Sequence, residues 1–486
     1  MQKRKPQIIK KTNIFCIFAG ENKTNTMEAT SREHRFLYID DKRQLTAWWL
    51  ITICFALWGV ASNVTTPMVG SFSKVFRITT GEASLVSFVY HLGYFCVAIP
   101  AALLIQKYSY KWGIVAGLIL FAFGTLAFIP SRWIGEYYPF LSAYFVMTCG
   151  LSFMQTSCNP YVYCLGDKKH GILRVNASQT FNALGTLGGW LLAREVFSKL
   201  SPIDSHQRLS MSLQQFNAIK DHDLGVMIQP YIVMGIIVVA ILALVMVVRI
   251  PEPADIRVSR NLRDRVKLLM ANKNYRDGVV AEFCYVGAEL MCWTFIMQYG
   301  TRIFTAEGMT EHACNQEIQK FTFLSLLFFT IGRIGATWLM RWFSACRLLA
   351  FAGVAAMVGV VGTILFTDRN GLYCLVLVSG CMSLMFPTIF GISMQGLGDH
   401  VKVGSAGLIM AILGGSVFPV LQAVIVNSGV TLLGVPSINV SFLLPLCCLG
   451  VVARYGHKSY VRFHLNPEEP AADDDDDKLS MPVPIE

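Results

Sequence analysis

The stretch MIQPYIVMGIIVVAILALVMVV, residues 227–248, contains no charged side chain. A helix rises about 1.5 Å per residue and the hydrocarbon core of a bilayer is about 30 Å thick, so about 20 apolar residues cross it. The stretch therefore predicts a transmembrane helix. The rest of the 486-residue chain has the same character, with 54% hydrophobic and only 15% charged residues. Such a chain cannot hide its apolar surface in water, so we expect lipid to be its solvent.

Twelve apolar runs of this kind predict an all-α membrane protein with twelve transmembrane helices, six in each half of the chain. The first six lie near residues 45–66, 84–105, 112–131, 140–162, 172–197 and 227–250. The second six lie near residues 277–300, 319–343, 346–366, 371–394, 402–426 and 438–456.

Five regions follow from these runs. We expect a largely disordered N-terminal tail (1–44), a six-helix bundle (45–250), a linker (251–276), a second six-helix bundle (277–456) and an acidic tail (457–486). Val258, Leu262, Val266 and Leu269 recur at roughly helical spacing, so we expect an amphipathic interfacial helix in the linker. Residues 1–26 precede a candidate natural start at Met27, and Asp473–Lys478 is typical of a cleavage tag.

The net charge of +10 is best explained by membrane topology, because the basic residues lie in short loops and tails. We expect no nucleic-acid partner. Loops assigned to the inside hold most of the Lys and Arg residues, so we expect both termini in the cytoplasm and the protein in the plasma (inner) membrane. The inside set includes Lys107, Lys111, Lys168, Lys169, the run Arg257–Arg276, Arg341, Arg347, Lys402, Arg454 and Lys458.

The two halves look related to each other. Asn159-Pro160 in the fourth run matches Phe386-Pro387 in the tenth, and Leu184–Gly189 in the fifth matches Ile412–Gly415 in the eleventh. Such symmetry favours two pseudo-symmetric bundles with a binding site between them at mid-membrane depth. Chance similarity between glycine-rich apolar segments is the alternative.

Uncharged amides are concentrated in the fourth and fifth runs. Gln155 and Asn159 are four residues apart and share one helix face, and Gln179 and Asn182 share another. Amides both donate and accept hydrogen bonds, so they can replace the hydration of sugar hydroxyls. Interhelical hydrogen bonding without a ligand is the alternative for any one of them. Tyr285 and Trp293 can pack against a sugar ring.

Few titratable residues lie within the runs: His91, Glu282, Glu289 and Arg333. Burial disfavours the ionised form of a carboxyl group, so a membrane Glu can load and release a proton. Glu289, Glu282 and His91 are therefore candidates for proton coupling. Arg333 is a candidate gating or structural charge, and pairing between it and a Glu is the alternative.

The chain resembles the fucose:proton symporter branch of the major facilitator superfamily, which includes glucose/galactose carriers. The resemblance extends from about residue 45 to 456. It is carried by Phe55–Gly59, Ile99–Ala102, Lys107–Lys111, Asn159–Tyr161, Arg174–Asn182, Phe283–Ala288, Cys292-Trp293, Ile331–Arg333, Thr337–Leu339, Phe386–Phe390 and Leu413–Gly415.

The resemblance implies two bundles that rock around a central sugar site lined by Gln179 and Asn182. It also exposes departures from the family. Ser62–Thr66 contains no acid where the family has a first-span carboxylate. Gln155 occupies the position of the fourth-span Glu, and is an amide in the glucose/galactose branch as well. Glu282 and Glu289 stand where relatives usually carry Gln.

These observations predict a secondary transporter of a hexose or a 6-deoxyhexose such as fucose. The expected substrate-binding residues are Asn63, Gln155, Asn159, Gln179, Asn182, Tyr285, Glu289 and Trp293. A co-transported proton, an uncoupled facilitator and a membrane sugar sensor remain open alternatives. We expect a monomer in the lipid bilayer with no cofactor and no metal, and no enzyme, because no motif for nucleophilic or metal chemistry is present.

Overall fold

The computed structural model describes residues 37–39, 41–65, 72, 75–78, 80–201, 203, 205–252, 262–429, 431 and 434–465. The predictions for residues 1–36, for Val258 and for the acidic run Asp473–Lys478 lie outside these ranges.

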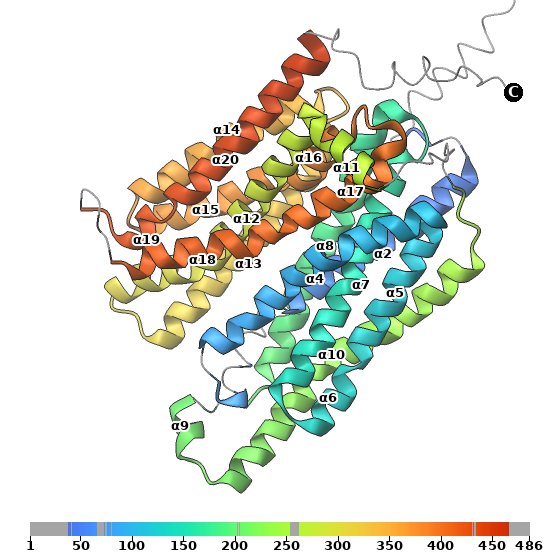
Figure 1. Cartoon of the computed structure of the whole chain (residues 1–486). Coiled ribbons are helices and arrows are strands. Elements are labelled where there is room, and N and C mark those ends of the chain that lie inside the picture. Colours follow the sequence, from blue (N-terminus) through green and yellow to red (C-terminus); the bar gives the residue numbers. More distant parts are fainter. Residues whose placement is uncertain are drawn as a thin grey trace, which may run out of the picture.

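The described chain is nearly all helical, and its helices form two groups that lie side by side (Figure 1). The first group is drawn in blue to green. It consists of α2 (Lys42–Thr65), α4 (Thr80–Lys107), α5 (Tyr110–Leu126), α6 (Phe128–Ile134), α7 (Tyr137–Cys164), α8 (Gly171–Ser198), the short α9 (Ser205–Ser210) and α10 (Leu213–Val247).

The second group is drawn in yellow-green to red. It consists of α12 (Lys273–Ala306), α13 (Glu311–Leu339), α14 (Ala345–Leu365), α15 (Arg369–Met382), α16 (Met385–Met394), α17 (Val401–Met410), α18 (Gly414–Asn427), α19 (Ser437–Val440) and α20 (Leu443–Tyr460). A short π-helical segment, Val461–Leu465, ends the described chain.

Ten helices in the described ranges are long and apolar enough to cross a membrane, which confirms ten of the twelve predicted spans. The other two predicted spans, 140–162 and 172–197, correspond to α7 and α8. Each of these helices has 28 residues, long enough to span the bilayer, but both are more polar than the other ten. These two helices carry the amide cluster. The same polar side chains that make them candidates for a binding site lower the hydrophobicity expected of a transmembrane helix.

Both bundles use glycine to bring their first and fifth helices into contact. A Cβ at Gly185 of α8 would lie 2.1 Å from the carbonyl oxygen of Ala56 in α2. In the second bundle, a Cβ at Gly414 would lie 2.1 Å from the carbonyl oxygen of Phe283 in α12. Backbones can approach this closely only where no side chain intervenes, as in other membrane helix pairs. The repeated contact supports the predicted internal symmetry.

The linker contains α11 (Leu262–Ala271), which packs against α12 and α17. Leu269 is buried and Leu262 is half-buried, whereas Val266 is exposed. The predicted helix is therefore present, and its contact with the protein uses only part of the predicted apolar stripe.

The longest helix, α10, has 35 residues and begins 14 positions before the predicted start at residue 227. Its first turns and α9 project beyond the neighbouring helices (Figure 1). A buried ion pair holds this projection together, because Arg208 Nη2 lies 2.6 Å from Asp223 Oδ2. The backbone N–H of Ser201 also donates to Asp223 (2.9 Å).

The two bundles are joined by hydrogen bonds at one end, where α7 ends and α8, α11 and α17 begin; we call it the linker end. These bonds are made by hydroxyl and amide groups rather than by opposite charges. They join Asn176 to Thr388 (3.3 Å) and Ser405 to the carbonyl of Thr156 (3.2 Å). A further bond between the bundles, from Thr330 to the carbonyl of Ala183 (3.3 Å), lies near the middle of α8. Single neutral hydrogen bonds contribute about 1 kcal/mol each, so the contact can open and close.

The glycine contacts generate a test with two matched substitutions on α8. We expect Gly185→Ala to destabilise the protein by about 1–3 kcal/mol, because the new methyl group has no room against α2. Gly188→Ala should be neutral or slightly stabilising, because no atom lies within 4 Å of its Cβ position and Ala suits a helix better. Thermal unfolding of the two purified variants checks the difference. Equal stability would show that the close contact of α2 with α8 is not required.

Candidate functional site

Three of the predicted amides form one connected chain between α7 and α8. Gln179 Nε2 donates to Asn159 Oδ1 (3.0 Å), and Asn159 Nδ2 donates to the carbonyl of Gln155 (3.1 Å). The i, i+4 spacing of Gln155 and Asn159 puts them on one face, and all three side chains are at most 2% exposed. The bond between Gln179 and Asn159 joins two helices without a ligand, as the alternative interpretation of these amides expects. The side chain of Gln155 takes no part in this bond and can bond elsewhere.

Gln155 ends a relay of hydroxyl groups that crosses three helices. Its Nε2 donates to the hydroxyl of Tyr94 (3.1 Å), which lies 3.4 Å from the hydroxyl of Tyr90. The Tyr90 hydroxyl is 2.7 Å from Ser62 Oγ of α2. Among the described residues Gln155 Oε1 has no hydrogen-bond partner, and it has no access to solvent. A buried amide oxygen without a donor is costly, so this atom can accept a bond from a bound hydroxyl group.

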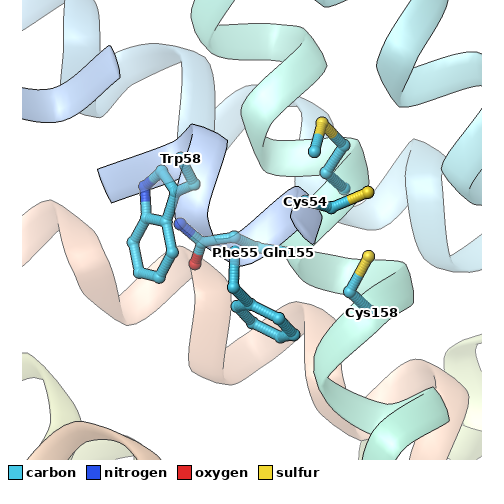
Figure 2. Close-up of a pocket in the computed structure, with 6 residues that line it drawn as sticks. Cys54, Phe55, Trp58, Gln155 and Cys158 are labelled. Carbon is cyan, nitrogen blue, oxygen red and sulfur yellow. The ribbon is translucent and has the colours of Figure 1, made fainter. Parts of the chain in front are cut away.

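Gln155 also lines a narrow pocket between α2 and α7 (Figure 2). Its amide lies beside the indole of Trp58, with Phe55 next to it and with Cys54 and Cys158 further along the pocket. The lining therefore places a polar amide among ring faces, which suits a ligand that has both hydroxyl groups and C–H faces. The pocket has a volume of only about 10 Å³, so a sugar can enter only after the surrounding helices move apart.

Asn182 and Asn63 lie at the contact between α2 and α8. Asn182 Nδ2 donates to the carbonyl of Phe55 (3.3 Å). A Cβ added to Gly189 of α8 would lie 3.2 Å from the Cβ of Asn63, and Asn63 is half-buried. Asn63 lies in the last turn of α2, at the end of the bundle opposite the linker, and is separate from the fully buried amides.

The second bundle contributes an acid, a phenol and an indole from one helix, α12. The Tyr285 hydroxyl lies 2.9 Å from Glu289 Oε1 and 3.1 Å from the carbonyl of Met382. Glu289 is half-buried, whereas Tyr285 is fully buried, so its ring is closed to a ligand in this conformation. Trp293 Nε1 donates to Ser379 (3.2 Å), and its ring meets the edge of Phe329 at 5.1 Å.

Arg333 of α13 connects the two bundles. Its Nη1 donates to the carbonyl of Gln179 (3.3 Å), and its guanidinium lies 5.0 Å from the ring of Phe329. The acids that face it are Glu289 and Tyr285. The residue is 2% exposed, and its Nε has no hydrogen-bond partner in the part of the chain that the structure describes. The predicted gating charge thus contacts the backbone of a candidate sugar-binding residue.

The two remaining candidates lie apart from the amides. His91 Nδ1 is 2.8 Å from the carbonyl of Ser87, and its Nε2 faces Gly415 of α18 across the bundle interface. Glu282 is fully buried, and neither carboxylate oxygen has a hydrogen-bond partner among the described residues.

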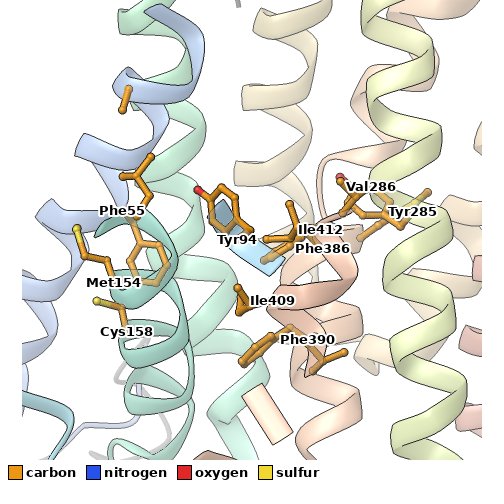
Figure 3. Packing of buried hydrophobic residues seen from close by; sticks show 14 of the residues in the cluster. Phe55, Tyr94, Met154, Cys158, Tyr285, Val286, Phe386, Phe390, Ile409 and Ile412 are labelled. Carbon is orange, nitrogen blue, oxygen red and sulfur yellow. The ribbon is translucent and has the colours of Figure 1, made fainter. Parts of the chain in front are cut away.

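Apolar side chains lie between the Gln155 relay and the Tyr285–Glu289 pair. Tyr94 of the first bundle lies beside Phe386, Ile409 and Ile412 of the second, and Phe55 lies farther away, beside Met154 (Figure 3). Trp58 and Phe386 approach to 6.1 Å between ring centroids, so ring faces from both bundles meet beside Gln155. Gln155 thus lies on the first bundle's side of these rings and Glu289 on the second bundle's side, whereas Arg333 reaches across to the carbonyl of Gln179.

Sequence reasoning missed Ser62 as a hydroxyl donor and both relay tyrosines. Tyr90 and Tyr94 are four residues apart in the second span, so their polar ends share one helix face. That spacing was the available signal, but an aromatic in a span is more often packed against lipid or core.

Comparisons with known proteins agree on one family. A model of the Major Facilitator Superfamily matches residues 51–423. The L-fucose-proton symporter of Haemophilus influenzae (strain ATCC 51907 / DSM 11121 / KW20 / Rd) is 37% identical over 86% of this chain and 98% of its own. The glucose/galactose transporter of Brucella abortus (strain 2308) is 28% identical over 84% of this chain and 92% of its own. The crystal structure of FucP, a transporter of the same superfamily in the outward conformation, has a TM-score of 0.77 at 29% identity, covering 86% of this chain and 99% of that one.

The relay predicts the outcome of a double-mutant cycle. Tyr94→Phe should cost about 1–3 kcal/mol of stability, because Gln155 Nε2 then loses its buried acceptor. Adding Gln155→Leu should cost less than the sum of the two single changes, because an apolar pair leaves no unmet donor. Thermal unfolding checks this, with Tyr108→Phe as control because Tyr108 is exposed. Additive effects of Tyr94→Phe and Gln155→Leu would contradict the relay.

Proposed function

The chain belongs to the Major Facilitator Superfamily, and from this membership we propose that it is a secondary transporter of a monosaccharide that works by alternating access. The proposed substrate is a hexose or a 6-deoxyhexose such as fucose. The relatives whose names state a substrate are an L-fucose-proton symporter and a glucose/galactose transporter. These sugars share a pyranose ring with several hydroxyl groups.

The observation that carries this proposal is the unpaired Oε1 of Gln155, at the end of a chain of neutral amides and hydroxyls. A neutral, hydroxyl-rich guest can complete that chain without bringing a charge into the membrane. Gln155, Asn159, Gln179 and Asn182 would bind hydroxyl groups, together with Asn63 at the half-buried end. Trp58 and Trp293 would pack against the ring, and Tyr285 would do so only after a rearrangement that exposes it.

The conformation supports alternating access. The hydrogen bonds of Asn176 with Thr388 and of Ser405 with Thr156 join the bundles at the linker end, which we assign to the cytoplasm because it carries most of the basic loop residues. With this assignment both termini are cytoplasmic and the sugar path is closed toward the inside. This agrees with the similarity to a structure in the outward conformation. We further propose that the protein acts as a monomer in the inner membrane and catalyses no chemical reaction.

We propose proton coupling through Glu289. It is half-buried, its carboxylate accepts from Tyr285, and it faces Arg333. Arg333 in turn holds the backbone of Gln179, so the charge state of Glu289 can influence the contact between bundles next to the sugar site. An uncoupled facilitator is the second candidate, because Gln155 and Asn63 are uncharged. A sensor that binds sugar without transport is the third candidate. Counterflow of labelled sugar in liposomes, if observed, would exclude a sensor.

Sugar binding can be tested by thermal shift, because a ligand that binds only the folded state stabilises it. We expect L-fucose, D-galactose or D-glucose to raise the unfolding temperature of the purified protein. Gln179→Ala and Asn182→Ala should each weaken the affinity about tenfold, the equivalent of one lost hydrogen bond. Gln229→Ala is the control, since Gln229 is exposed on α10. No stabilisation by any monosaccharide would contradict the proposed substrate class.

Glu289→Gln should separate coupling from transport. Labelled sugar should still exchange in counterflow, whereas sugar-driven alkalinisation outside the vesicles should disappear, because an amide cannot carry a proton. The control is Glu307→Gln at the end of the same helix. Arg369 donates to Glu307 and lowers the pKa of its exposed carboxyl group, so it stays ionised and takes no part in the cycle. An unchanged pH response in Glu289→Gln would rule out Glu289 as the coupling site.

A further inference from the structure

Glu282 is an acid that the proposed sugar site does not use. It lies on α12, is 0% exposed, and neither carboxylate oxygen has a hydrogen-bond partner within the described chain. The groups that face it are Glu289 and Tyr285 on its own helix and Tyr455 on α20. All three are acids rather than bases. A buried carboxylate without a counter-charge is strongly unfavourable, so Glu282 must bind either a cation or a proton.

Two hydroxyl groups lie against α12 one helical turn before Glu282, where a Cβ on Gly278 would lie 1.9 Å from Ser393 Oγ and 2.9 Å from the Tyr455 hydroxyl. Only glycine lets α12 approach these two hydroxyls so closely. They are 2.9 Å apart, and the Tyr455 hydroxyl also lies 3.4 Å from Asn274 Oδ1. The face of α12 that carries Glu282 therefore packs against neutral oxygen donors from α16 and α20.

The span that contacts α12 at Tyr285 is interrupted at Ser383 and Leu384. α15 ends at Met382 and α16 begins at Met385, and both segments pack against α12. The interruption leaves the Met382 carbonyl to accept a bond from the Tyr285 side chain. Broken membrane helices with exposed carbonyl groups and a nearby carboxylate are used by transporters to coordinate small cations.

We propose that Glu282, with Ser393 and Tyr455, forms a binding site for a small monovalent cation, Na⁺, in the second bundle. Hard oxygen ligands suit Na⁺ and not a soft metal ion. The single carboxylate is neutralised by one positive charge, whereas a divalent ion such as Ca²⁺ takes more oxygen ligands and usually several carboxylates. The site is distinct from Glu289, which has Tyr285 and Arg333 as neighbours.

Binding of radiolabelled Na⁺ to the purified full chain, without sugar, tests the site. We expect saturable binding at one Na⁺ per chain, and a rise in unfolding temperature in NaCl relative to choline chloride. Glu282→Gln should weaken Na⁺ binding at least tenfold and abolish the rise. Ser393→Ala should weaken binding less. Glu307→Gln, the same change on an exposed acid of α12, should bind Na⁺ like the wild type.

Two checks keep the outcome decisive. Glu282→Gln should unfold in choline chloride at or above the wild-type temperature, because it removes the buried charge, and Glu282→Asp should retain weakened binding if the Gln variant misfolds. Absence of Na⁺ binding to the wild type, or equal binding in Glu282→Gln, overturns the proposal and leaves Glu282 as a proton site. Because no sugar is present, these results do not depend on the proposed sugar transport.

Discussion

A polar side chain inside a bilayer has no water to bond with, so every such group must find its partner within the protein or in a ligand. This constraint explains the centre of the molecule. α7 and α8 are too polar to count as ordinary spans, yet they lie in the middle of an apolar bundle because their amides bond to one another. The relay to Tyr94, Tyr90 and Ser62 gives the side-chain nitrogen of Gln155 its partner. The Oε1 atom of Gln155, which has no partner among the described residues, marks the place for a guest.

The two bundles meet this constraint in different ways. In the first bundle the central side chains are neutral, so a sugar can be bound and released without moving a charge. In the second, Glu282, Glu289 and Arg333 hold the membrane-embedded charges. Arg333 reaches across to the backbone of Gln179, which connects a charged side chain of the second bundle directly to the neutral amide chain of the first. Because the charged groups are gathered in the second bundle, the first and fourth spans can lack the acids that the family resemblance led us to expect there.

Much of this could be predicted from the sequence, because apolar run length and amide clustering depend on local composition. That Gln179 and Asn159 belong to one polar cluster could be predicted for that reason. The Tyr90–Tyr94 relay could not, because its partners come from three helices whose relative rotation is set by glycine contacts such as Gly185 with Ala56. The burial of Tyr285, and the position of His91 against Gly415, depend on packing between bundles, which no single span reveals.

The long helix α10 has a mechanical consequence. Its 35 residues extend about 50 Å, well beyond a hydrocarbon core of about 30 Å, so its first turns stand clear of the lipid. The buried pair of Arg208 and Asp223 clamps α9 onto this projection, so it moves with the first bundle as a rigid arm. An antibody fragment that binds this projection would add mass and help to orient the particles in electron cryomicroscopy, and it would leave the path between the bundles free.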